Sequence, residues 1–312
     1  MGLGAAFGIG VLVAIQSRVN GELGHRLGDG IPAALISFGS GLVILLVAAG
    51  VLPRVRNGLL RVWRAITGPG GGLRWYQCVG GVGGAFLVAT QSVTVATLGV
   101  AVFTVAVVGG QAMSSLLVDR FGIGPAGKQP LTVLRVIGAV AALAAVVFAV
   151  SDRLTHPQGL ALAVLPALAG IGTALQQGIN GRVARTASNA AYGAVAAAVI
   201  NFLVGTTALA ALFAVDLVFR GAPRPLPSDP WLYVGGACGV AFISLAAAFV
   251  RVIGVFVLGL GTIAGQLVAS LVLDLTVPAA DHPVTASVAA GTALALLAVV
   301  GAAAPGLRPH PS

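Results

Sequence analysis

Long apolar runs, separated by short polar segments, dominate the pattern of this chain. The hydrocarbon core of a bilayer is about 30 Å thick, and a helix needs about 20 apolar residues to cross it. The sequence therefore predicts an all-α polytopic membrane protein with ten transmembrane helices. The predicted spans are residues 2–19, 31–52, 76–97, 99–118, 131–150, 159–178, 190–215, 231–250, 252–273 and 284–304.

Two pairs of these spans leave almost no residues for a loop. The third and fourth spans must turn at Thr97-Leu98-Gly99, and the eighth and ninth at Arg251-Val252-Ile253-Gly254. A glycine tolerates backbone angles that other residues avoid, so it suits a tight helical hairpin. We expect two such hairpins.

The two halves of the chain carry the same motifs in the same order, at an offset between 155 and 164 residues. In the first half these are Gln16-x-x-x-Asn20-Gly21, Ile36-Ser37-Phe38, Trp75 before Val79-Gly80-Gly81, and Gly110-Gln111. Their counterparts in the second half are Gln176-x-x-x-Asn180-Gly181, Ile200-Asn201-Phe202, Trp231 before Val234-Gly235-Gly236, and Gly265-Gln266. We divide the chain into repeats at 1–152 and 153–312. Five spans per repeat is an odd number, so the second repeat enters the membrane from the opposite side. The sequence thus predicts two inverted five-helix repeats, an architecture common among secondary transporters.

Arginine and lysine in the loops predict the orientation, because they accumulate on the cytoplasmic side. One side of the membrane receives twelve basic residues, namely Arg54, Arg56, Arg61, Arg64, Arg74, Arg120, Lys128, Arg135, Arg182, Arg185, Arg251 and Arg308. The other side receives only five, namely Arg18, Arg26, Arg153, Arg220 and Arg224. Both termini are therefore expected in the cytoplasm, with the protein in the cell membrane.

Polar side chains inside the spans are the candidates for a transport pathway. An amide at membrane depth costs several kcal/mol if it has no partner, so it pairs across helices or lines a wet cavity. Bonding between helices and contact with a substrate are both open for each residue. The candidates are Gln16, Asn20, Ser37, Gln111, Gln176, Asn180, Asn201 and Gln266.

Carboxylates are scarce within the spans. Glu22, Asp119 and Asp274 lie near span ends and are the candidates for coupling transport to protons. The chain has no nucleotide-binding glycine motif ending in Lys-Ser or Lys-Thr, which argues against an ATP-driven pump.

Composition excludes several other classes of protein function. Charged residues make up 8% of the chain, whereas soluble domains carry about a quarter, and the mean hydropathy is +1.03. The net charge of +9 is spread between apolar runs, so it sets membrane orientation and does not indicate a nucleic-acid partner. The scattered histidines, with Cys78 and Cys238, show no metal-ligand spacing. We therefore expect no cofactor, and we expect no enzymatic activity because no set of catalytic groups converges.

The motifs quoted above resemble the YdcZ-like branch of the drug/metabolite transporter superfamily. The resemblance rests on the Gln-x-x-x-Asn-Gly and Ile-Ser-Phe motifs, the Val-Gly-Gly span after Trp75, and the segment Gly-Gln-Ala-Met-Ser-Ser-Leu-Leu-Val-Asp-Arg-Phe-Gly at 110–122. In the second half Leu275-Thr276 replaces the Phe-Gly of that segment. The resemblance covers nearly the whole chain, and it implies ten helices and the transport of a metabolite or drug.

The sequence is thus interpreted as a secondary transporter of a small organic solute that works by alternating access between two inverted repeats. A lipid flippase or scramblase, and a structural membrane protein without solute transport, are the alternatives. The expected partners are a small-molecule substrate and the lipid bilayer, and a homodimer is left open.

Overall fold

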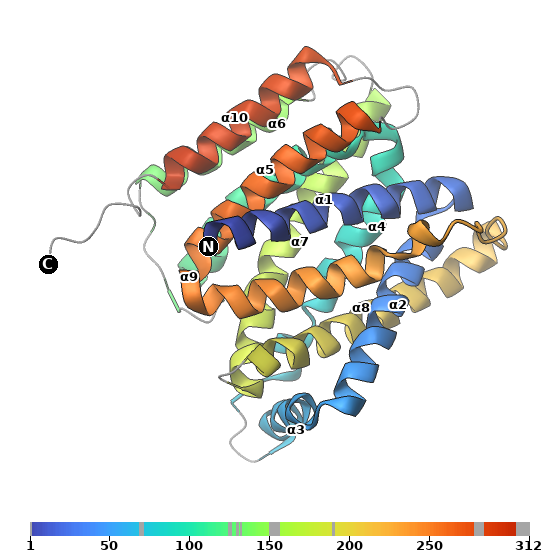
Figure 1. Cartoon of the computed structure of the whole chain (residues 1–312), viewed down its shortest axis with the longest axis vertical. Coiled ribbons are helices and arrows are strands. Elements are labelled where there is room, and N and C mark those ends of the chain that lie inside the picture. Colours follow the sequence, from blue (N-terminus) through green and yellow to red (C-terminus); the bar gives the residue numbers. More distant parts are fainter. Residues whose placement is uncertain are drawn as a thin grey trace, which may run out of the picture.

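The computed structural model describes residues 2–68, 72–123, 127–128, 131, 133–149, 157–188, 191–277 and 284–303. Over these residues the fold consists of helices and their connections (Figure 1). The helices are α1 (Gly2–Leu27), α2 (Gly30–Val51), α3 (Pro53–Thr67), η1 (Trp75–Cys78), α4 (Gly81–Leu98), α5 (Val100–Phe121), α6 (Val133–Ala149), α7 (Pro157–Ala187), α8 (Ala191–Arg220), η3 (Pro230–Tyr233), α9 (Gly235–Thr276) and α10 (Ala286–Ala303).

Several helices are long and apolar enough to cross a membrane, by length and composition. Five segments of the described chain meet this criterion, at Gly30–Val51, Trp75–Leu98, Val100–Val118, Leu162–Ala187 and Ala191–Arg220, and shorter apolar helices accompany them. Many large apolar side chains point outward, among them Val47, Leu203 and Val218, which is 79% exposed. An outer surface of this kind fits contact with lipid chains, where apolar exposure costs nothing.

The first predicted hairpin is present. Helix α4 ends at Leu98, and α5 begins at Val100. Between them Gly99 has φ +82°, a conformation that a residue with a Cβ rarely adopts. The turn at Thr97-Leu98-Gly99 is therefore confirmed.

The second predicted hairpin takes another form. Helical backbone continues through Arg251–Gly254 as part of α9, and the α9 ribbon bends back at the left of Figure 1. The bend divides α9 into two arms. We call Gly235–Ala246 the first arm and Gly261–Thr276 the second arm. The side chains of residues 250–258 lie outside the described residues.

One helix of each half is enclosed by two elements of the other half. Helix α1 lies between the two arms of α9 (Figure 1). It meets the second arm so closely that a Cβ on Gly10 would lie 2.0 Å from the carbonyl oxygen of Thr262. Helix α7 packs in the same way against α4 and α5, and a Cβ on Gly170 would lie 2.1 Å from the carbonyl oxygen of Val107. Small residues allow these close approaches between membrane helices.

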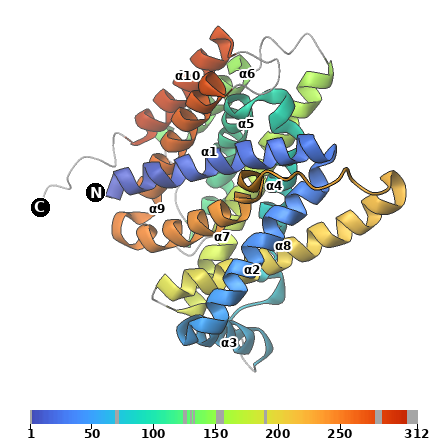
Figure 2. The same cartoon turned by 45° about the vertical axis from the view of Figure 1, so that its right-hand side comes forward.

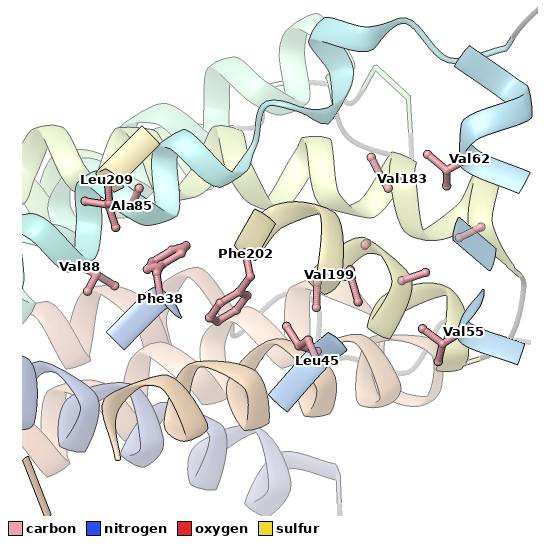
Figure 3. Packing of buried hydrophobic residues seen from close by; sticks show 14 of the residues in the cluster. Phe38, Leu45, Val55, Val62, Ala85, Val88, Val183, Val199, Phe202 and Leu209 are labelled. Carbon is pink, nitrogen blue, oxygen red and sulfur yellow. The ribbon is translucent and has the colours of Figure 1, made fainter. Parts of the chain in front are cut away.

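Helices α2 and α8 cross near the middle of the main hydrophobic core. The rings of Phe38 and Phe202 lie 4.8 Å apart between centroids, with planes inclined by 32°, and Figure 3 shows them within that cluster. Each ring fits against a glycine of the other helix, since a Cβ on Gly41 or Gly205 would lie 2.3 Å from a ring carbon. This aromatic pair joins the two halves.

Helix α3 was not expected from the sequence, where its residues were interpreted as a loop between spans. It begins at Pro53 directly after α2 and lies at the lower end of the molecule in Figures 1 and 2. Val55 and Val62 are buried against α7 and α8. Its four arginines made the segment too polar for a span, although its apolar residues recur at helical spacing.

Candidate functional site

A first polar cluster links α1 to α4. The Asn20 amide nitrogen donates to Gln91 Oε1 over 2.8 Å, and Gln91 Nε2 donates to Ser17 Oγ over 2.9 Å. Asn20 and Gln91 are fully buried. Bonds of this kind satisfy amides that would otherwise be unpaired in a low-dielectric interior.

Two oxygens at this first cluster, one of them from Ser37 of the adjacent helix α2, lack a partner in the described structure. They are Asn20 Oδ1 and Ser37 Oγ, and both are buried. The two atoms converge on Gly235 of α9, because a Cβ at that position would lie 2.3 Å from the first and 2.9 Å from the second. The first arm of α9 thus covers two free hydrogen-bond acceptors with a glycine backbone.

A second polar cluster links α7 to α8. Gln176 Nε2 and Asn180 Nδ2 both donate to Asn201 Oδ1, over 2.9 Å and 3.0 Å. Asn201 is 1% exposed, and its own Nδ2 has no acceptor among the described residues. A Cβ on Gly81 would lie 2.1 Å from the Asn201 carbonyl oxygen, so α4 closes over this cluster as α9 closes over the first.

The two clusters lie on either side of the Phe38–Phe202 pair. A Cβ on Gly84 would meet both Gln176 Nε2, at 2.5 Å, and the Phe38 ring, at 3.2 Å. A Cβ on Gly239 would meet both Gln16 Nε2, at 2.8 Å, and the Phe202 ring, at 3.2 Å. Six of the eight candidate residues therefore gather around one aromatic pair, in two separate groups.

Gln111 and Gln266 lie outside these groups, at the helix crossings. The backbone nitrogen of Gln266 in α9 lies 2.6 Å from a Cβ built on Gly10, and that of Gln111 in α5 lies 2.9 Å from a Cβ built on Gly170. Gln266 is buried, and Gln111 is half-buried. The structure places these two residues in matching positions but does not bring them to the other six.

The three candidate carboxylates have different surroundings. Glu22 accepts from Arg26 Nε over 2.9 Å, and Arg26 also binds Asp229. Asp119 belongs to the last turns of α5, and its side chain lies outside the described residues. Asp274 is buried, and its two oxygens accept from the backbone N–H groups of Val100 and Ala101, over 2.9 Å and 2.7 Å.

The bonds of Asp274 have a clear structural effect. The first N–H groups of a helix have no partner within it, and a carboxylate there also interacts favourably with the helix dipole. Asp274 of the second arm therefore caps α5 and fixes the turn at Gly99.

Gln91 and Ser17 are polar residues of the site that the sequence analysis did not select. The search favoured polar positions that recur in both halves, and at the local offset of 155 residues Gln91 corresponds to Ala246. An amide in the middle of an apolar span was the available signal, since such a group needs a partner.

The clusters are closely packed, and the described hollows lie elsewhere. One hollow of about 390 Å³ lies beside α3, and another of about 300 Å³ is lined by Leu73, Gln77 and Arg182 among others. Within the described residues no group of three His, Cys, Asp or Glu side chains could hold a metal ion. The site therefore offers amide and hydroxyl groups for recognition through hydrogen bonds.

Comparison with protein families identifies the chain. Residues 1–148 and 161–301 match the family described as "Putative inner membrane exporter, YdcZ". The chain belongs to this YdcZ family of the drug/metabolite transporter superfamily. It is thus an inner-membrane, multi-pass protein of an exporter family, as the resemblance of its motifs indicated. Membership in an exporter family implies transport and not catalysis.

Comparisons with individual proteins provide information on the fold and not on the function. A search among curated proteins finds no match. A crystal structure described only as that of a protein is similar, with a TM-score of 0.57 and 19% sequence identity, over 98% of this chain and 95% of the other. The YdcZ chain therefore shares its arrangement of helices with a protein of very different sequence.

Proposed function

We propose that this YdcZ protein exports a small organic solute by alternating access between two inverted five-helix halves, residues 1–152 and 153–312. The ten spans of the proposal are α1, α2, α4, α5 and α6 in the first half, and α7, α8, the two arms of α9 and α10 in the second. Both termini lie in the cytoplasm. No nucleotide-binding motif accompanies the chain, so the energy comes from a gradient and not from ATP.

The reciprocal packing of α1 and α7 is the observation that carries this proposal. A helix of the first half lies between two arms of the second, and a helix of the second lies between α4 and α5 of the first. In the repeat, Gly10 of α1 corresponds to Gly170 of α7, and Thr262 of α9 corresponds to Val107 of α5. The two close contacts are therefore equivalent. A pseudo-two-fold axis in the membrane plane produces such a relation, and it gives two end states of similar energy.

The contact of α1 with α4 supports a closed gate on one side of the membrane. A Cβ on Gly24 would lie 2.2 Å from the Ser92 carbonyl oxygen, and one on Gly21 would lie 2.6 Å from the Val95 side chain. The bond from Asn20 to Gln91 lies on the same stretch of α1. In the proposed orientation this is the periplasmic side, so the structure corresponds to a state closed to the outside.

The unpaired polar atoms support a solute that forms hydrogen bonds. Asn20 Oδ1 and Ser37 Oγ can accept, and Asn201 Nδ2 can donate, once the helices that cover them separate. We assign Gln16, Asn20, Ser37, Gln176, Asn180 and Asn201 to the pathway beside the Phe38–Phe202 pair. Gln111 and Gln266 are assigned to the helix crossings that rearrange.

Among the carboxylates, we assign proton coupling to Glu22. Its ion pair with Arg26 is partly exposed, with 22% of the Glu22 side chain accessible, and protonation would weaken it. Asp274 holds the turn between α4 and α5, and Asp119 stays a prediction from the repeat. The homodimer also stays a prediction.

Efflux from proteoliposomes tests the proposal. Vesicles with the purified chain are loaded with a library of metabolites, without ATP, and the solutes that leave are measured by mass spectrometry against protein-free vesicles. Export predicts that at least one solute leaves faster from the vesicles that contain the protein.

The same vesicles test the alternatives. Movement of a fluorescent phospholipid between leaflets, without efflux of any solute, would identify a flippase or scramblase and overturn the proposal. Silence in both assays with folded protein would indicate a structural membrane protein.

A further inference from the structure

Helix α3 is amphipathic, with a basic face that has no acidic neighbour in sequence. Val55, Gly58 and Val62 are buried, whereas Arg54, Arg56, Arg61 and Arg64 are all exposed. The chain has no Asp or Glu between Asp29 and Asp119. The ion pairs found in the described residues lie elsewhere, at Arg26 and Arg220.

An open groove runs beside this helix. Its volume is about 390 Å³, and its residues from other elements are Cys78 and Ile200. Binding sites for small molecules occupy on the order of 300–1,000 Å³, so the groove is large enough for part of a ligand. Its lining is almost wholly apolar, with one arginine, Arg56.

The groove side of α3 combines apolar and cationic groups in one row. Arg56, Leu60 and Trp63 are four and three residues apart, so they lie on one side of the helix. Leu60 is 47% exposed and Trp63 is 65% exposed. Arg61 lies on the other flank of the helix and does not line the groove. A tryptophan beside an arginine at a helix end is typical of the membrane–water interface.

We propose that this groove binds an anionic phospholipid. The phosphate pairs with the Arg56 guanidinium, which binds phosphate through a planar pair of donors, and an acyl chain lies along Leu60 and Trp63 in the apolar groove. The charge of α3 favours an anionic lipid over a zwitterionic one. This lipid site does not depend on the transported solute. Its test and the test of the proposed export therefore have independent outcomes.

Fluorescence of Trp63 tests this proposal in the full-length chain. Trp75→Phe and Trp231→Phe leave Trp63 as the single tryptophan. The protein is placed in phosphatidylcholine vesicles that contain a small, equal fraction of brominated phosphatidylglycerol or brominated phosphatidylcholine. Bromine on the acyl chain quenches a nearby indole. We expect stronger quenching by the brominated phosphatidylglycerol, with an enrichment of about fivefold at Trp63, which corresponds to about 1 kcal/mol for one arginine near the surface.

Two variants distinguish a site from a diffuse charge. Arg56→Gln is expected to remove most of the enrichment, while Arg61→Gln, with the same loss of charge on the other flank, is expected to keep most of it. Circular dichroism and gel filtration establish that both variants are folded. Equal quenching by the two lipids in the parent protein would overturn the proposal, as would equal losses in the two variants. Release of the lipid by millimolar inorganic phosphate would assign Arg56 to soluble anions and would also overturn it.

Discussion

The two polar clusters start from the same motif but are bonded differently. In α1 the asparagine of Gln-x-x-x-Asn donates to Gln91 of α4, whereas in α7 both amides of the motif donate to Asn201 of α8. Ser37 is the counterpart of Asn201, and its Oγ has no partner in the described structure.

Two sequence differences account for this divergence. With serine in place of asparagine, α2 has no side-chain amide to accept from the α1 motif. Gln91, in place of the alanine found at position 246, provides an amide acceptor on α4 instead. Both clusters lie within one half, but the first joins α1 to α4, whereas the second joins the consecutive helices α7 and α8. The comparison teaches that an internal repeat can keep its packing while changing which helices its polar groups connect.

The largest expected effect comes from two matching glycines, Gly81 beside the second cluster and Gly236 beside the first. Gly81→Ala and Gly236→Ala place a Cβ 2.1 Å and 2.3 Å from a backbone carbonyl oxygen. We expect each to lower the free energy of unfolding by about 3 kcal/mol, the upper end for overpacking. Equilibrium unfolding in mixed micelles measures it. Gly39→Ala is the control, because it has open space around it. A large difference between the two glycine variants would break the equivalence of the halves.

Asn201→Ala is expected to have the next largest effect. It leaves the buried amide of Gln176 and the half-buried amide of Asn180 without their acceptor, and each unsatisfied buried group costs about 1–3 kcal/mol. Since bonds between membrane helices are weaker on average, we expect a total loss of about 2 kcal/mol in the same unfolding assay. A loss below that of Ser37→Ala would contradict the bonding described for the second cluster.

Gln91→Leu tests the connection of the first cluster to α4. It removes the acceptor of Asn20 and the donor to Ser17 but keeps the volume. Since a hydrogen bond between membrane helices is worth about 0.6 kcal/mol on average, we expect a loss of about 1 kcal/mol. The α1–α4 contact should then open more often. A cysteine at the buried position Val95, in the background without Cys78 and Cys238, should react about fivefold faster with a membrane-impermeant maleimide added outside. An unchanged rate would mean that Gln91 does not hold this gate.

Ser37→Ala should have the smallest effect on stability. The Ser37 hydroxyl has no partner among the described residues, so its removal should change the free energy of unfolding by less than about 0.5 kcal/mol. Efflux from proteoliposomes is the second measurement. Reduced efflux at unchanged stability would indicate that the hydroxyl binds solute, whereas unchanged efflux would remove Ser37 from the proposed pathway.

Much of the helical framework could be predicted from the sequence, because lipid imposes a minimum length of apolar chain on every crossing. The turn at Gly99 followed from the lack of residues for a loop. A turn near Arg251–Gly254 was predicted in the same way. That helical backbone continues through it was not, since the apolar pattern is the same for one bent helix and for two separate ones. Helix α3 was missed for a related reason, because a search for apolar runs passes over a helix with only one apolar face.

The polar residues were predicted as a set, and their grouping was not. Repetition in both halves selected Gln16, Asn20, Gln176 and Asn180, which the structure places in two clusters. It could not select Gln91, which has no polar counterpart. Nor could it foresee that Asp274 would bind backbone N–H groups of the other half, because spacing along the chain says nothing about which helix ends meet.

The cap on α5 has a consequence for biosynthesis. Asp274 is made 174 and 173 residues after the two amides that it binds, and synthesis proceeds from the N-terminus. The turn between α4 and α5 therefore enters the membrane before its acceptor exists, with two N–H groups open. The N-terminus of α5 gains its cap only when the second arm of α9 has been inserted. Insertion of that arm therefore sets the time at which α4 and α5 reach their final arrangement.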